Sequence, residues 1–160
     1  MHWAELYEYQ RQLDKYIEQH KNVEKESVVD HKTLAFYVEL GELANETRCF
    51  KFWSNKPESD HETIREEYVD GLHFLLSLGI ELNSYVESAE ISDVTSRTEA
   101  FLTVYQRLGE WKREKTKQTY QNLFDAYVTL AAALNISEED MKQAYLEKND
   151  ENYDRQDRGY

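Results

Sequence analysis

The chain has 160 residues, a formal net charge of −13, 40% hydrophobic residues and 32% charged residues. This length and composition fit one globular domain, residues 1–160, and exclude a disordered chain. The excess of acidic residues argues against binding to duplex nucleic acid or to an anionic membrane surface, since both need a basic face on the protein. A small phosphate ligand is compatible with this charge only where metal ions or a local cluster of Lys and Arg neutralise it.

Five glycines and one proline are too few turn signals for a many-stranded sheet and favour long helices. No apolar run reaches the roughly 20 residues that cross a bilayer, and residues 1–5 lack the basic start of a signal peptide. The single cysteine, Cys49, cannot form an internal disulfide, so we expect a small half-buried side chain in a reducing compartment. These features predict a cytoplasmic all-α protein.

The first predicted helix covers about residues 3–20, where apolar residues recur at helical spacing. The polar stretch 21–30 is predicted to be a loop, and a second, strongly apolar helix follows over about residues 31–46. An aromatic segment, residues 49–54, then leads into a loop that contains Pro57.

The third predicted helix runs from about His61 to Leu78, with Ser59 or Asp60 as its N-cap and Gly79 as its stop signal. It is apolar over most of its circumference, which indicates a central position. We therefore expect several other helices to pack against it.

Three more helices are expected in the second half of the chain. A fourth covers about residues 93–108, a fifth covers about 110–134, and a last one begins at a capping box at 137–140 and ends near Lys148. The polar tail, residues 149–160, has no periodicity of its own. The fold is predicted to be a single bundle of five to six helices.

Acidic residues within the two most apolar helices are the most informative feature of the sequence. Glu39, Glu42 and Glu46 follow one another at i, i+3 and i+7 and share one helical stripe. Glu67 and Asp70 repeat the i, i+3 spacing on the third helix. Carboxylates that face one another near a packed core repel unless a cation joins them. Oxygen ligands without histidine or thiolate select a hard ion, Mg²⁺ or Mn²⁺, whose usual chemistry is with phosphates.

This spacing has two other interpretations. An acidic i, i+3 pair is most often a solvated helix face. A ferritin-like di-iron bundle needs the carboxylate-x-x-His motif on two helices. Asp70 and His73 form one such motif, and no second one lies within the predicted helices. Spacing alone therefore leaves the metal site and the solvated face as the open alternatives.

The two acidic motifs also carry a family resemblance. Residues 39–42 (ELGE) and 67–70 (EYVD) resemble the E-x-x-E…E-x-x-D signature of the all-α nucleotide pyrophosphohydrolases, which include MazG-type enzymes, phosphoribosyl-ATP pyrophosphohydrolases and dimeric dUTPases. Four more segments resemble the dimeric dUTPase branch in particular: residues 10–14 (QRQLD), 52–54 (FWS), 70–74 (DGLHF) and 148–160 (KNDENYDRQDRGY).

This resemblance implies roles for individual residues. Glu39, Glu42, Glu67 and Asp70 would hold Mg²⁺, with Mn²⁺ as a substitute, and Glu39 or Glu42 would activate the attacking water. The implied nucleotide contacts are Gln10 and Asp14 with the uracil and deoxyribose, Trp53 with the base or sugar, His73 with the deoxyribose hydroxyl, and Lys148, Asn152 and Arg155 with the phosphates or the nucleoside. The tail, from about residue 148, would close over the ligand. The family often has Asn where this chain has Asp14.

Without the resemblance, several of these residues have plainer interpretations. Trp53 fits a core residue, His73 a structural histidine, Gln10 a surface residue, and the tail a frayed C-terminus. Lys148 and Arg155 in an otherwise acidic chain nevertheless suit an anion clamp.

The reaction that the resemblance implies is hydrolysis of dUTP to dUMP and pyrophosphate by a homodimer, which limits uracil in DNA. dUDP is a second candidate substrate. Two alternatives remain at this point: a MazG-like pyrophosphohydrolase for another deoxynucleoside triphosphate, and a non-catalytic helical interaction module.

Overall fold

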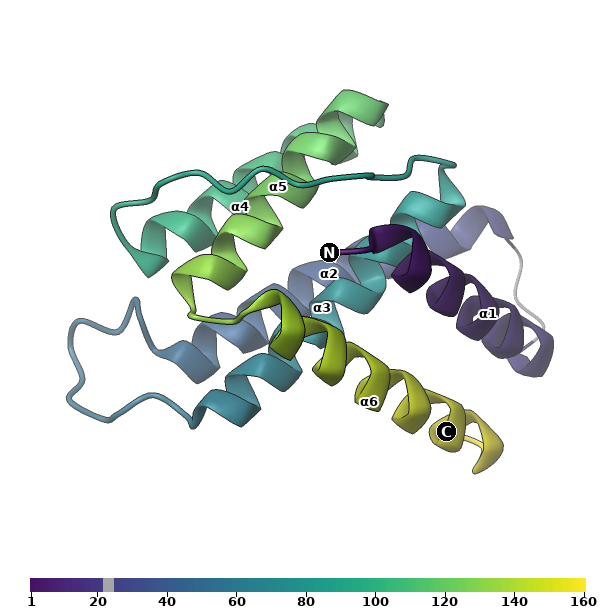
Figure 1. The fold of residues 1–160 in the computed structure, drawn as a ribbon, viewed down its shortest axis with the longest axis horizontal. Helices are drawn as coiled ribbons and strands as arrows, with labels where there is room; N and C mark the ends of the chain where they lie inside the picture. The colour runs from purple at the N-terminus through teal and green to yellow at the C-terminus, as the bar shows by residue number, and fades with distance from the viewer. Residues whose placement is uncertain (22–24) are drawn as a thin grey trace.

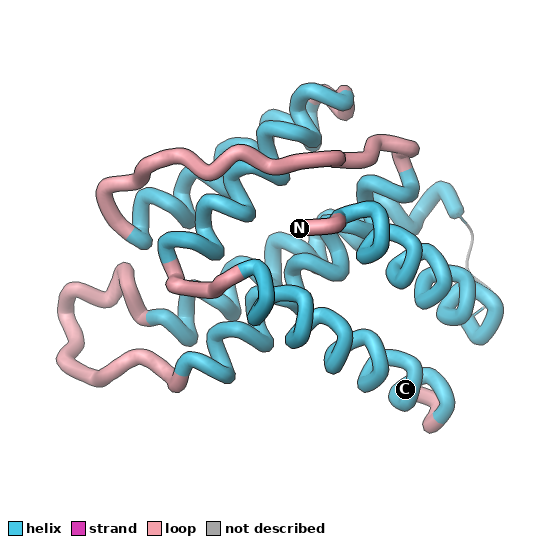
Figure 2. The backbone as a smooth tube through the Cα atoms, viewed as in Figure 1, coloured by secondary structure: helices cyan, strands magenta, loops and turns pink. Residues whose placement is uncertain are grey.

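A computed structural model describes residues 1–21 and 25–160. These residues form six helices and no strand (Figures 1 and 2): α1 (Trp3–Lys21), α2 (Lys25–Thr47), α3 (His61–Glu81), α4 (Arg97–Arg113), α5 (Lys117–Ala133) and α6 (Glu138–Asp157). The prediction of an all-α bundle is confirmed. No helix in the described ranges is long and apolar enough to span a membrane.

Helix α3 lies at the centre of the bundle, as its all-round apolar sequence predicts. It packs against α1, α2, α5 and α6, and its Tyr68, Leu72 and Leu76 side chains are fully buried. Helices α4 and α5 lie side by side as a pair on one side, while α1 and α6 cover α3 on the other (Figure 1). One face of α3 thus meets α1, α2 and α6 together, which is the arrangement that builds the site.

Two of the predicted helix starts are confirmed by their caps. The Asp60 side chain accepts a hydrogen bond from the Thr63 backbone N–H at the start of α3, and Ser137 does the same for the Asp140 N–H at the start of α6. A capped N-terminus satisfies a backbone donor that the helix itself leaves free.

The predicted loop at 21–30 is wrong over residues 25–30, which belong to α2, while residues 22–24 lie outside the described chain. The polar composition of this stretch concealed an inward face. Val28 is buried, and the Thr33 hydroxyl donates to the Val29 carbonyl within the helix. Packing of this face therefore extends the helix beyond the strongly apolar part.

The stop signal at Gly79 is also wrong, because α3 continues through it to Glu81. Gly79 is buried, and a Cβ atom there would collide with the Tyr120 hydroxyl and the Ser84 carbonyl oxygen. The glycine is needed for close packing against α5 and does not end the helix.

The boundary between the fourth and fifth helices falls later than predicted. Helix α4 runs through Gly109 to Arg113, and α5 begins after Thr116, which forms a capping box with Thr119. The glycine misled the prediction because a single exposed glycine is tolerated inside a helix at modest cost.

The C-terminal tail is helical, contrary to the prediction of an irregular segment. Helix α6 extends to Asp157 and packs against α1 and α3. Asn149 is buried, the Tyr153 ring lies 4.9 Å from the Tyr16 ring, and the Tyr16 hydroxyl donates to Asp157. These contacts with α1 stabilise the helical tail, although its sequence has no apolar periodicity.

Candidate metal and nucleotide site

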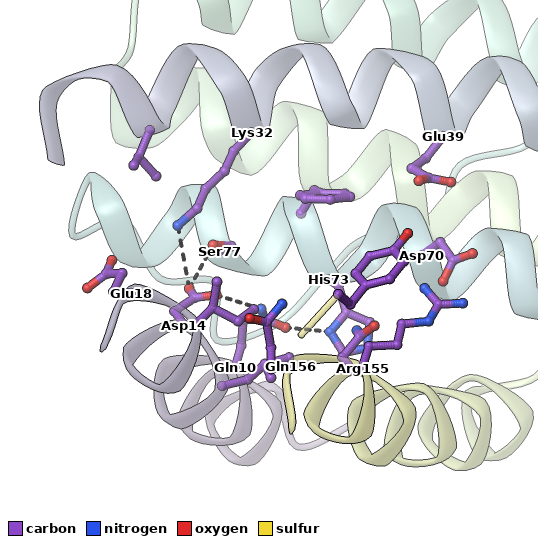
Figure 3. Close-up of a pocket in the computed structure, with 16 residues that line it drawn as sticks. Gln10, Asp14, Glu18, Lys32, Glu39, Asp70, His73, Ser77, Arg155 and Gln156 are labelled. Carbon is purple, nitrogen blue, oxygen red and sulfur yellow. Dashed lines mark hydrogen bonds and ion pairs between the residues drawn. The ribbon is translucent and has the colours of Figure 1, made fainter. Parts of the chain in front are cut away.

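A cavity of about 350 Å³ opens where α1, α2, α3 and α6 meet (Figure 3). Seven of the predicted site residues line it: Gln10, Asp14, Glu39, Asp70, His73, Asn152 and Arg155. One end is walled by apolar side chains, among them Leu13, Ile17, Val28 and Phe74. This volume and this mixture of walls are typical of a small-molecule site.

Three carboxylates converge at the polar side of this cavity. Glu39 comes from α2, while Glu67 and Asp70 come from successive turns of α3, and one oxygen of each lies within 4.8 Å of the others. The Oε2 atoms of Glu39 and Glu67 are buried and have no hydrogen-bond partner in the described part of the protein. Burying carboxylate oxygens without hydrogen-bond donors costs free energy unless a bound cation compensates their charge.

The pKa values of these three carboxyl groups are raised. Burial, followed by the charges of Asp70 and Glu42, raises the pKa of Glu39 to about 8. Burial and the neighbouring Asp70 raise the pKa of Glu67 to about 7. Burial also raises the pKa of Asp70, although the Lys148 ammonium opposes this. Like charges in a half-buried site favour protonation in the absence of a cation.

Of the other acidic residues on α2, Glu42 lies at the edge of the triad, and Glu46 is bonded to a loop residue although its charge also raises the pKa of Glu67. Glu42 is exposed, yet its charge helps to raise the pKa of both Glu39 and Glu67. The Glu46 carboxylate accepts a hydrogen bond from the Ser59 hydroxyl in the α2–α3 loop.

The basic residues of α6 lie against the acidic triad. Lys148 Nζ is 3.3 Å from Asp70 Oδ1 and 3.2 Å from Glu151 Oε2. Arg155 Nη2 is 2.6 Å from Glu151 Oε1, and its guanidinium lies over the Tyr160 ring. The helical tail thus places Lys148 beside Asp70 of the triad and Arg155 in the wall of the cavity.

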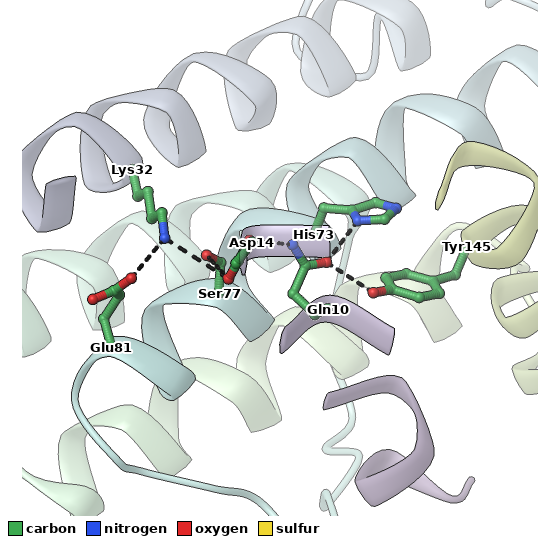
Figure 4. A network of polar contacts seen from close by, with 7 residues as sticks. All are labelled: Gln10, Asp14, Lys32, His73, Ser77, Glu81 and Tyr145. Atoms are coloured by element: carbon green, nitrogen blue, oxygen red, sulfur yellow. Dashed lines mark hydrogen bonds and ion pairs between the residues drawn. The ribbon is translucent and has the colours of Figure 1, made fainter. Parts of the chain in front are cut away.

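A network of buried polar side chains lines the cavity beside α1 (Figure 4). Gln10 Nε2 donates to Asp14 Oδ1 at 2.9 Å, and the Ser77 hydroxyl donates to Asp14 Oδ2 at 2.7 Å. His73 Nδ1 lies 2.7 Å from Gln10 Oε1, which also accepts from the Tyr145 hydroxyl at 2.8 Å. Gln10 is therefore a buried residue, and the surface interpretation is wrong.

His73 is neutral in this setting. Burial lowers the pKa of its imidazole to about 3, and the ring stacks on Tyr145 with centroids 4.1 Å apart. Its Nε2 atom is buried without a partner among the described residues.

Trp53 lies away from this cavity. It stands on the α2–α3 loop with 64% of its surface exposed, next to Phe52 at 93%, so it is not a core residue. The loop projects from one end of the bundle in Figure 1.

Three residues that contact the predicted site residues were not predicted from the sequence: Lys32, Ser77 and Tyr145. Lys32 lies seven residues before Glu39 and Ser77 lies seven after Asp70, so both share the helical stripe of a predicted ligand. That spacing was a usable signal. Tyr145 offered none, because its helix carries little amphipathic pattern.

Comparison with known proteins agrees with the geometry. A family model described as dUTPase matches residues 2–160. No curated protein matches the chain.

Proposed function

This chain belongs to the dUTPase family, and on that premise we propose that it hydrolyses dUTP to dUMP and pyrophosphate at the α1–α2–α3–α6 cavity, with Mg²⁺ as its metal. The observation that carries the proposal is the convergence of Glu39, Glu67 and Asp70 beside a cavity that also contains Gln10 and His73. An acidic triad that can hold a cation for the phosphates and a polar pocket with apolar walls are the two parts of a site that a nucleotide requires.

The residues present fit a hard divalent cation. Their donors are oxygens only, and two of those oxygens are buried without a hydrogen bond in the described structure. Glu39, Glu67 and Asp70 would hold the ion, with the exposed Glu42 as the fourth predicted ligand. When bound, Mg²⁺, or Mn²⁺ as a substitute, neutralises phosphate charge and lowers the pKa of a bound water.

The chain's own residues supply the rest of the reaction. Water adds to phosphorus, the α–β bridging P–O bond breaks, and pyrophosphate departs. The carboxylate of Glu39 or Glu42 accepts the proton that the water loses. Lys148 and Arg155 offset negative charge on the phosphate oxygens, Lys148 as a point charge and Arg155 by paired hydrogen bonds.

The nucleoside half of the substrate is assigned to the other end of the cavity. Leu13 and Phe74 offer apolar walls to a flat base. Gln10, Asp14 and Asn152 supply polar groups for the uracil and deoxyribose, and His73 meets the deoxyribose hydroxyl. dUDP is a second candidate substrate.

We further infer a homodimer in which Trp53 serves the partner's site. Trp53 is exposed and outside its own cavity, so it can pack against a base only in a second copy of the chain. The α2–α4 face supports this assembly, because Leu34, Val38 and Leu102 are 65%, 49% and 64% exposed. Exposed apolar side chains on neighbouring helices are typical of an interface.

A panel of nucleotides tests the activity. The purified protein is incubated with dUTP, dCTP, dTTP and UTP, with Mg²⁺ and then with a chelator, and dUMP and pyrophosphate are quantified. We expect dUTP to be preferred by roughly 10²-fold or more, because a site with buried polar groups rejects a mismatched base. Even activity across bases would favour the MazG-like alternative, and no hydrolysis of any nucleotide would favour a non-catalytic module. In a cell, the activity would lower dUTP in the cytoplasm and limit uracil in DNA.

A further inference from the structure

One cation of the cavity, Lys32, has no role in the reaction described above. It lies on α2, its Nζ is 2.9 Å from Glu81 Oε1 and 3.8 Å from Asp14 Oδ2, and its side chain is largely buried at 16% exposure. Asp14 is also buried. A buried ion pair contributes little net stability, because desolvation of the two charges offsets their attraction. Lys32 does, however, affect two neighbouring groups.

The first effect is on the orientation of Gln10. Burial raises the pKa of Asp14, but the Lys32 ammonium and the Ser77 hydroxyl, which donates to Oδ2, favour its carboxylate form. A carboxylate can only accept hydrogen bonds. The Gln10 amide must therefore turn its NH₂ toward Asp14 Oδ1. Its carbonyl oxygen then faces the opposite way, toward His73 and Tyr145.

The second effect is on the tautomer of His73. A carbonyl oxygen can only accept, so the proton of the neutral imidazole must lie on Nδ1, 2.7 Å from Gln10 Oε1. The other nitrogen, Nε2, is then a bare acceptor. This atom is buried, unpartnered within the described chain, and belongs to a residue that lines the cavity. A donor that a ligand brings would satisfy it.

We propose that Lys32 is a positioning residue that acts through Asp14 and Gln10 to hold His73 in the Nδ1–H tautomer, so that Nε2 accepts a hydrogen bond from a sugar hydroxyl of the substrate (Figure 4). This inference rests on the proposed function for the identity of the ligand. The hydrogen-bond chain itself crosses three helices and is a property of the protein without ligand.

A bare Nε2 acceptor should favour nucleotides that carry a sugar hydroxyl over those that lack it. A buried acceptor that is left without a donor penalises a nucleotide that lacks the hydroxyl. We expect a 2′,3′-dideoxy analogue of dUTP to lose roughly 10²-fold in kcat/KM relative to dUTP. Replacement of Lys32 by methionine lets Gln10 turn over, and the ratio should fall to about tenfold or less because Nε2 then carries a proton for part of the time.

The first test is a nitrogen-15 NMR spectrum of the imidazoles in the ligand-free protein, with the His73 signals identified by their loss in His73→Gln. We expect Nδ1 to be protonated and Nε2 to be bare in the parent protein, and both tautomers in Lys32→Met. Lys32→Arg should restore the parent spectrum, and Lys142→Met, which removes an exposed lysine paired with Glu5 on the outer face of α6, should not alter it.

The proposal is overturned by a parent protein that carries the proton on Nε2, or by a Lys32→Met variant that keeps both the parent tautomer and the parent selectivity. Should Lys32→Met fail to fold, Asp14→Asn keeps the side-chain shape, can donate to Gln10, and must show the same mixture of tautomers. Because these spectra need no substrate, a correct tautomer in a protein that does not hydrolyse dUTP would overturn the proposed function alone.

Discussion

At the residue scale, the site is a cluster of carboxylates that repel one another until a cation binds between them. Glu39 is the most informative member, because it has a raised pKa and an unpartnered buried oxygen. We expect Glu39→Gln to lower kcat by 10²-fold or more, as loss of a metal ligand or general base does. Steady-state kinetics with dUTP and Mg²⁺ measure this. Glu66→Gln is the matched control, since Glu66 is an exposed glutamate on the adjacent α3, and an equal loss there would contradict the assignment.

The same cluster predicts how the metal-free protein responds to pH. Folding raises the pKa of Glu39 to about 8 and of Glu67 to about 7, so the folded state holds protons that the unfolded state has lost. Stability in a chelator should therefore fall as the pH rises from about 5 to about 8, between the pKa values of the unfolded and folded states. The apparent affinity for Mg²⁺ should rise over the same interval, because the ion displaces these protons. Thermal melts and calorimetric titrations report both trends, and a flat stability profile, or an affinity independent of pH, would be contrary evidence.

The acidic spacing foretold these residues because side chains at i and i+3 share a helical face. It could not foretell that Glu46 is held by Ser59 while Glu42 stays at the rim, since both lie on the same stripe. That distinction depends on where α3 and its preceding loop pack. The spacing places Lys32 on the helical stripe of Glu39, but it does not reveal that the partners of Lys32 are Asp14 on α1 and Glu81 on α3.

At the element scale, the position of the site depends on how closely α3 and α5 approach. A Cβ atom at Gly71, directly after Asp70, would collide with the Tyr127 hydroxyl, which donates to the Tyr68 carbonyl. The Tyr127 ring also stacks on Tyr68 with centroids 4.3 Å apart, so it cannot move aside cheaply. We expect Gly71→Ala to destabilise the protein by about 2 kcal/mol through overpacking. Chemical denaturation measures the change.

The control for this prediction is Tyr127→Phe, which removes the colliding hydroxyl. In that background the cost of Gly71→Ala should shrink, and a double-mutant cycle gives the coupling. Equal costs in both backgrounds would show that the collision is not the cause.

Periodicity and caps predicted the helix types, the starts of α1, α3 and α6, and the ends of α1, α2 and α5, but not the other boundaries. Gly79 and Gly109 both suggested helix ends. Gly79 is instead a close packing contact within α3, and Gly109 is an exposed residue within α4. The tail, residues 149–160, has no apolar periodicity, so the sequence did not predict that it is helical. Contacts of α6 with α1 and α3 stabilise this part of the helix. Tertiary contacts decided each of these boundaries.

At the scale of the whole molecule, the distance between Trp53 and its own cavity implies that two copies of the chain complete each site. Trp53→Ala and Glu39→Gln should each be inactive alone. When the two variants are unfolded together and refolded, random pairing should restore roughly a quarter of the sites, because each mixed dimer rebuilds one intact site. Activity that stays at the level of the separate variants would place Trp53 outside the partner's site.

The α2–α4 face gives an independent check on this assembly. Leu34→Arg places a charge on an exposed apolar position that the proposed interface buries. We expect it to yield monomers in light scattering while the helical content is retained. Glu114→Arg, at the exposed C-terminal cap of α4, serves as the control charge change. A Leu34→Arg protein that is still dimeric would require another interface.

The most direct test of the central claim is a crystal structure of the protein with Mg²⁺ and a non-hydrolysable dUTP analogue. We expect metal density between Glu39, Glu67 and Asp70, phosphates beside Lys148 and Arg155, and a base and sugar beside Gln10 and His73. Density for the nucleotide outside this cavity, or an acidic triad that holds no metal at saturating Mg²⁺, would contradict it.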